Sequence, residues 1–131
     1  MAIVITTSTD SLDGPFDPRF GRAAYFCLVD AKTGDFQAFP NAAVSAAGGA
    51  GVQASQFIGN HGAEAVISGD FGPNAYMTLN AAGIRMYLAP AGESLTGRQL
   101  LERYRAGELQ EATGGPTHGG RHGGGGRGRR R

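Results

Sequence analysis

The chain has 131 residues, of which 40% are hydrophobic, and a formal net charge of +1. This length suits one compact domain and is too short for two ordinary ones. No apolar run approaches the roughly 18 to 20 residues that a membrane-spanning helix needs. The opening MAIVITTSTD has no basic region, long apolar region or cleavage site of a secretory signal, so we expect a cytoplasmic protein with no membrane contact.

Charge is divided unevenly along the chain. The residues from Gly114 onward hold five of the 12 Lys and Arg and none of the 11 acidic residues. The part before them therefore carries about −4, which provides no global field for nucleic acid. The single cysteine, Cys27, excludes an intrachain disulfide and a metal site built from several thiolates of one chain.

The first half of the sequence predicts strands followed by a helix. Residues 3–9 are β-branched and apolar and predict a buried strand, after which residues 10–22 form a loop rich in Asp, Pro and Gly. Residues 24–31 and 36–39 predict an antiparallel pair joined by the KTGD turn. A glycine-rich stretch then enters a helix that ends before Gly62.

The second half alternates strands and helices. Residues 63–70 and 84–90 predict parallel strands around a helix over 73–83. The segment 92–112 predicts a last helix, with Ser94 or Thr96 as its N-cap. This order predicts a single α/β domain over residues 1–112, with a mixed five-stranded sheet and helices on its faces. The Gly-, Arg- and His-rich residues 113–131 offer no apolar surface to bury, and we expect a flexible tail there.

Three loops are candidates for a binding cleft: residues 7–22, 46–52 and 69–75. Ligands of open α/β sheets collect beyond the carboxyl ends of parallel strands, where helix N-termini direct their amides outward. Such amides suit an anion, although the glycines also fit a role in turns and packing alone. Neither GxGxxG nor GK[ST] occurs, which argues against a nucleotide.

The segment FDPRFGR adds two arginines to the first of these loops. Arg19 and Arg22 stand beside Phe16 and Phe20, and arginine suits a bulky anion because its charge is diffuse and its donors are forked. The alternative is that one arginine pairs with a nearby aspartate and stiffens the loop.

No established catalytic motif is present, and we expect a protein that is not an enzyme. Asp10 and Asp70 near strand ends are candidates for an acid–base pair, but they lack a nucleophile, a base or a metal cage. His61, in NHG, fits a helix C-cap better than a metal ligand, and Cys27 fits a buried strand position.

Two histidines of the tail are weak candidates for metal ligands. His118 and His122 are close enough in sequence to chelate a soft divalent metal loosely. The tail equally fits a solvated charged segment, a contact for an acidic partner, or an RNA contact.

Taken in order, the motifs resemble the dinitrogenase iron–molybdenum cofactor biosynthesis family, which includes NifX-type carriers, the C-terminal domain of NifB-type proteins and the orange protein. The resemblance covers about residues 1–112. The matching residues are Asp17, Phe20, Gly21, Arg22, Ala23, Tyr25 and Phe26, the GGAG turn at Gly48 to Gly51, SGDFGPNA at Ser68 to Ala75, AAGI at Ala81 to Ile84, and LLERYRAGEL near the end of the domain.

The resemblance implies a ribonuclease-H-like fold without nuclease function. It implies non-catalytic binding and carriage of an anionic molybdenum-containing metal–sulfur cluster, either a molybdenum–copper sulfide or a precursor of the iron–molybdenum cofactor. Many relatives carry His or Cys just before the GGAG turn, where this chain has Ala46 and Ala47. This difference favours a carrier like the orange protein, in which sulfide supplies the metal ligands.

Partners implied by the resemblance are the cluster itself and a protein that donates it, accepts it or hydrolyses ATP. The alternative function is a protein-interaction module in a cluster-assembly or ATPase-associated complex, without a bound cluster. Cofactor-binding residues are expected at Thr7, Ser8, Arg19, Phe20, Arg22, Gly48, Gly49, Ala50, Gly51, Gly69, Asp70, Phe71, Gly72 and Asn74.

Overall fold

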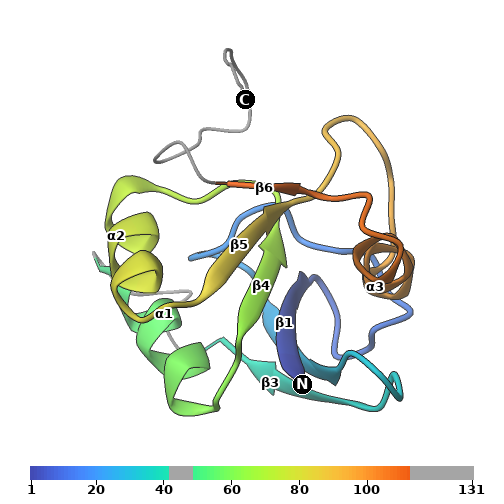
Figure 1. The fold of residues 1–131 in the computed structure, drawn as a ribbon, viewed down its shortest axis with the longest axis horizontal. Helices are drawn as coiled ribbons and strands as arrows, with labels where there is room; N and C mark the ends of the chain where they lie inside the picture. Colours follow the sequence, from blue (N-terminus) through green and yellow to red (C-terminus); the bar gives the residue numbers. More distant parts are fainter. Residues whose placement is uncertain (42–48, 113–131) are drawn as a thin grey trace.

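The structure is a computed structural model that describes residues 1–41 and 49–112. It contains one sheet in the strand order β3-β2-β1-β4-β5-β6 (Figure 1). The strands are β1 (Ala2–Thr7), β2 (Tyr25–Asp30), β3 (Phe36–Pro40), β4 (Ala65–Ser68), β5 (Arg85–Leu88) and β6 (Gln110–Glu111). The helices are α1 (Ala50–Asn60), α2 (Pro73–Ala81) and α3 (Gly97–Arg105).

The directions of the strands follow the predicted order. β1, β2 and β3 form an antiparallel meander, and β1 also pairs in parallel with β4. β4 pairs in parallel with β5, and α2 connects these two strands. The mixed sheet, antiparallel at one side and parallel in the middle, is therefore confirmed.

The predicted number of strands is wrong, because the sheet has six strands and not five. The sequence pattern predicts one helix over residues 92–112, whereas α3 spans only Gly97–Arg105. Gly107 has a φ of 73°, a left-handed conformation that glycine adopts without steric cost and that a helix cannot continue. The chain then turns back, and Gln110 and Glu111 pair with β5.

Helices cover both faces of the sheet, with α1 and α2 on one side and α3 on the other (Figure 1). Alternation along β1 decides which core each side chain joins. Val4 packs in the cluster that includes residues of α1 and α2, whereas Ile3 and Ile5 pack with Leu100 and Leu101 of α3. Since both faces are buried, the central strands read as nearly continuous apolar runs.

The helix ends follow sequence signals of different strength. Thr96 caps α3 with a full capping box, in which its side chain accepts from the backbone N–H of Gln99 at 3.1 Å. α1 ends at Asn60 with His61 as its C-cap, and Gly62 follows with a φ of 76°. The interpretation of His61 as a C-cap is confirmed.

Some predictions concern residues outside the described ranges: Gly48, the tail over 113–131, and the candidate ligands His118 and His122. The relation to the ribonuclease-H-like fold stays a prediction. In the described part of the chain, none of the helices has the length and apolarity needed to cross a membrane.

Candidate functional site

Two close contacts join the 10–22 loop and α2 to the N-terminus of α1. A Cβ added to Gly21 would lie 3.1 Å from the Cα of Gly51, and one added to Gly51 would lie 3.1 Å from the Cβ of Ala75. These positions have no room for an ordinary side chain unless a neighbour moves. The main chains of two predicted loops and the start of α2 are therefore held side by side.

A third contact ties the same loop to the loop between β4 and α2. A Cβ at Gly69 would lie only 2.6 Å from the Cβ and 2.7 Å from the carbonyl oxygen of Pro18. The backbone N–H of Asp70 donates to that oxygen at 3.0 Å, within a parallel bridge between Arg19 and Asp70. The three loops predicted to form a cleft are thus brought together as far as the structure describes them.

Buried polar groups beneath these loops fix them to the sheet, and the sequence analysis missed their role. The Thr6 hydroxyl donates to the carbonyl of Asp17 at 2.6 Å, and its oxygen lies 2.8 Å from the Ser68 hydroxyl, with which it shares a second hydrogen bond. The amide of Asn41 donates to the carbonyls of Gly21 and Ala23 at 3.1 and 2.8 Å. Their signal in the sequence was weak, since polar residues at strand ends are common.

Two helix N-termini of this region lack a side-chain cap. The N-cap residues of α1 and α2 are Gly49 and Gly72, and neither makes a side-chain hydrogen bond to its helix. The first-turn amides of a helix have no partner inside it and carry partial positive charge. The N-terminal ends of α1 and α2, which include the predicted residues Ala50, Gly51 and Asn74, therefore favour an anion.

Arg19 is held by a buried carboxylate. Its Nε and one terminal nitrogen donate to the two oxygens of Asp17, each at 3.1 Å, and its backbone N–H donates to Asp17 at 3.0 Å. These hydrogen bonds and the attraction of the charges raise the pKa of the Arg19 guanidinium. The alternative of an arginine paired with a nearby aspartate is thus confirmed for Arg19, although its side chain remains 65% exposed.

The other predicted side chains divide into exposed and buried ones. Ser8, Arg22 and Asn74 are exposed. Phe20 and Phe71 are core residues with ring centroids 5.4 Å apart, and Thr7 is fully buried with its hydroxyl bonded to the Thr9 carbonyl. The buried members therefore support the loops from below, and their side chains offer no surface to a ligand.

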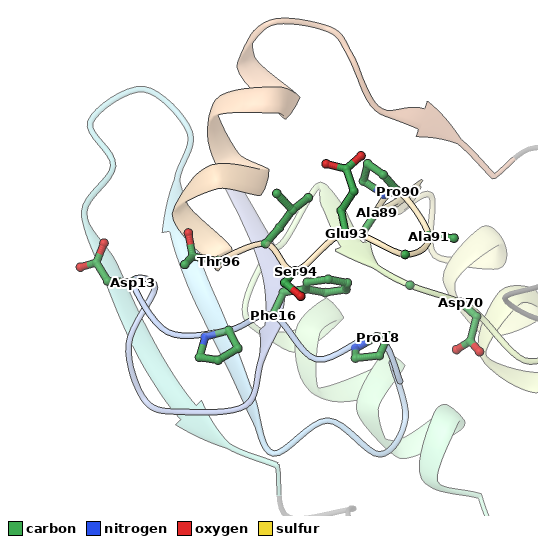
Figure 2. A pocket seen from close by; sticks show the side chains of 14 residues that line it. Asp13, Phe16, Pro18, Asp70, Ala89, Pro90, Ala91, Glu93, Ser94 and Thr96 are labelled. Atoms are coloured by element: carbon green, nitrogen blue, oxygen red, sulfur yellow. The ribbon is translucent and has the colours of Figure 1, made fainter.

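A pocket of about 590 Å³ includes Pro18, Gly69 and Asp70 in its lining and so lies next to these loops (Figure 2). Of the three predicted loops it involves parts of two, and it adds the loop after β5, which the sequence analysis missed. That loop follows a parallel strand, so the rule that selected the others applies to it equally. The lining residues are Asp13, Pro15, Phe16, Pro18, Gly69, Asp70 and Ala89 to Thr96.

The pocket combines an apolar lining with carboxylates. Figure 2 shows Asp13 and Asp70 toward opposite ends of the lining, with Phe16 between them and Glu93 on the loop that leads into α3. Asp13 accepts from Arg98 at 2.6 Å and Glu93 from Arg103 at 2.9 Å. We refer to this pocket below as the acidic pocket.

Within residues 1–41 and 49–112, no three His, Cys, Asp or Glu side chains lie close enough together to hold a metal ion. Cys27 is fully buried, and burial raises the pKa of its thiol. His61 lies at the opposite end of α1 from Gly49, about 16 Å along a helix of 11 residues. Its ring packs against Phe57 and Phe39.

These features define an α/β domain whose loops gather at the carboxyl ends of its central strands. Residues 1–107 match the sequence model of a protein family whose description is "Dinitrogenase iron-molybdenum cofactor". The chain therefore belongs to this family, as the motifs predicted.

Solved structures with the same fold agree with this membership. The apo form of the orange protein from Desulfovibrio gigas is 39% identical, with a TM-score of 0.83 over 89% of this chain and 96% of that one. A candidate NifB protein from Thermotoga is 29% identical, with a TM-score of 0.72 over 84% and 91% of the two chains.

A curated relative matches over a shorter stretch. An uncharacterized protein of Methanocaldococcus jannaschii is 32% identical over 75 residues, which are 55% of this chain and 64% of that protein. The chain thus spans a little under two thirds of that relative's length.

Proposed function

We propose that this domain binds and carries an anionic molybdenum-containing metal–sulfur cluster and does not itself catalyse a reaction. Family membership and the similarity to the orange protein support a role in cofactor biosynthesis or cluster binding. The observation that carries the proposal is the pair of helix N-termini without side-chain caps, packed against the arginine-bearing loop. Amides and guanidinium groups together bind anions through charge-assisted hydrogen bonds.

The donor set of the described residues suits a cluster whose own sulfides hold the metals. The thiol of Cys27 is buried in the sheet, on the strand next to β1, and does not reach the loop surface. The loops instead present backbone amides near Gly49 and Gly72, with Arg19 and Arg22 on the surface. We infer that the protein recognises the outer shape and charge of a preformed cluster, either a molybdenum–copper sulfide or a precursor of the iron–molybdenum cofactor.

Titration of the purified chain with tetrathiomolybdate and copper tests this function. We expect a visible absorption band that stays with the protein on desalting, with fixed ratios of molybdenum and copper to protein by metal analysis. Loss of all metal on desalting would reject the molybdenum–copper cargo. The same experiment with an iron–molybdenum precursor would then decide whether the chain carries a cluster at all.

Replacing Arg22 with alanine tests the placement of the site. Hydrogen bonds to charged groups contribute about 1.5–3 kcal/mol, so we expect cluster retention at least about tenfold weaker in Arg22→Ala. The matched control is Lys32→Ala, which removes one exposed positive charge from the turn after β2, near the start of β1 and thus at the opposite end of the strands from the loops. Equal retention in the two variants would show that the cluster binds elsewhere.

A further inference from the structure

The acidic pocket differs from the proposed cluster site in the charge of the side chains that line it. Its lining contains three acidic residues, Asp13, Asp70 and Glu93, and none of its lining residues is basic. Carboxylates repel an anionic cluster and attract cations. A ligand that enters this pocket is therefore expected to carry positive charge.

Guanidinium groups already bind at the edge of this pocket. Arg98 donates to one carboxylate oxygen of Asp13, and Arg103 donates to both oxygens of Glu93, at 2.9 and 3.4 Å. The side chains of Asp13 and Glu93 remain 66% and 46% exposed beside these partners. They are therefore accessible to further guanidinium groups.

The apolar part of the lining suits arginine as well. Phe16, Pro18 and Leu95 are among the lining residues. Arginine side chains lay their aliphatic stems along apolar surface and place the guanidinium over aromatic rings, while the charged end reaches a carboxylate. Segments rich in arginine and glycine fit such a surface because glycine lets the backbone approach closely.

The chain itself contains such a segment, residues 113–131, which follows β6. Residues 113–131 include five arginines and no acidic residue, whereas the rest of the chain carries a net charge of about −4. Gln110, in β6, pairs with Leu88 at the end of β5. Ala89, which follows Leu88, lines the pocket. β6 runs antiparallel to β5, so the chain leads away from the pocket to Ala112, whose N–H donates to the carbonyl of Met86. The 19 residues that follow span at most about 65 Å, which is long enough to return to the pocket.

We propose that the basic segment over residues 113–131 docks into the acidic pocket of its own chain. Its arginines pair with Asp13, Asp70 and Glu93 while their stems cover the apolar lining. Tethering raises the effective concentration of the segment to the millimolar range, so weak individual contacts are sufficient for occupancy. This inference does not rest on the proposed cluster function.

The test uses the full chain with a nitroxide label on Gly126→Cys, since Cys27 is fully buried and stays unlabelled. The nitroxide broadens the NMR signals of nearby nuclei. We expect the backbone amide signals of Gly14, Gly92 and Glu93 to lose more than half of the intensity that they have in the sample with the reduced label. The loss should disappear at about 0.5 M NaCl, where the Debye length falls to a few ångström. Broadening spread evenly over the surface, or concentrated at another face, overturns the proposal.

Charge variants separate specific docking from general attraction. The double variant Asp13→Asn with Glu93→Gln should abolish the broadening, and the matched control Asp35→Asn with Glu64→Gln, which removes two exposed carboxylates away from the pocket lining, should preserve it. Equal effects of the two double variants contradict the proposal. Mixing labelled chain with unlabelled isotope-enriched chain provides the last control, because broadening between molecules would assign the pocket to a second copy.

Discussion

Replacing Phe71 with alanine is expected to lower the free energy of unfolding by about 3–5 kcal/mol. Phe71 is 0% exposed, and its ring packs against Phe20 at a centroid distance of 5.4 Å. Removing the ring leaves a cavity in the core cluster beneath α1 and α2. It also removes the side chain that anchors the loop between β4 and α2 to that core. A loss of this size is a large part of the 5–15 kcal/mol that stabilises an ordinary domain.

The measurement is equilibrium urea unfolding followed by far-ultraviolet circular dichroism, because the chain has no tryptophan for fluorescence. Met77→Ala is the matched control, since Met77 lies on α2 and is 67% exposed. Its substitution should change the free energy of unfolding by less than about 0.5 kcal/mol. Similar losses in both variants would mean that Phe71 is not a core residue.

Gly69→Ala is expected to cost about 1–3 kcal/mol although it adds a single methyl group. The new Cβ would meet the backbone oxygen of Pro18 at 2.7 Å, and main chain cannot rotate away as a flexible side chain does. The contact between the 10–22 loop and the loop into α2 must then open. We expect cluster retention to fall with stability in this variant.

Gly59→Ala, the same chemical change at another position, is expected to raise the stability of the protein. Gly59 lies inside α1, and the added Cβ would meet only Ile84, at an ordinary 3.8 Å. Alanine is more favourable than glycine inside a helix by about 0.8–1.0 kcal/mol, so this variant should be more stable than the parent. Losses of stability in both variants would indicate a general intolerance to alanine and would refute the steric argument at Gly69.

The sequence predicted the order and type of the larger elements because their patterns are strong. The apolar runs of β1 and β4, the KTGD turn and the glycine stop after α1 each specify a structure locally. β6 was not predictable in this way, because two residues show no periodicity. Gln110 and Glu111 are strand residues only because β5 offers an edge to pair with.

The candidate site was predictable as a set of loops and less so as a set of side chains. The rule on strand ends selected the loop into α2 and, applied to β5, would have selected residues 89–96 as well. The spacing of Asp17 and Arg19 allowed their pairing, but the burial of Asp17 depends on the whole fold. The contacts of Gly21 and Gly69 with distant backbone leave no trace in the local sequence.

The central position of β1 has a consequence for the order of folding. Its antiparallel partner β2 begins 18 residues after β1 ends, whereas its parallel partner β4 begins at Ala65. Closing a loop costs more conformational entropy as the loop lengthens, so the β1–β2–β3 meander should form before β4 is added. Until then one edge of the buried strand β1 has no partner, and that exposed edge is the place where a nascent chain is most open to pairing with another molecule.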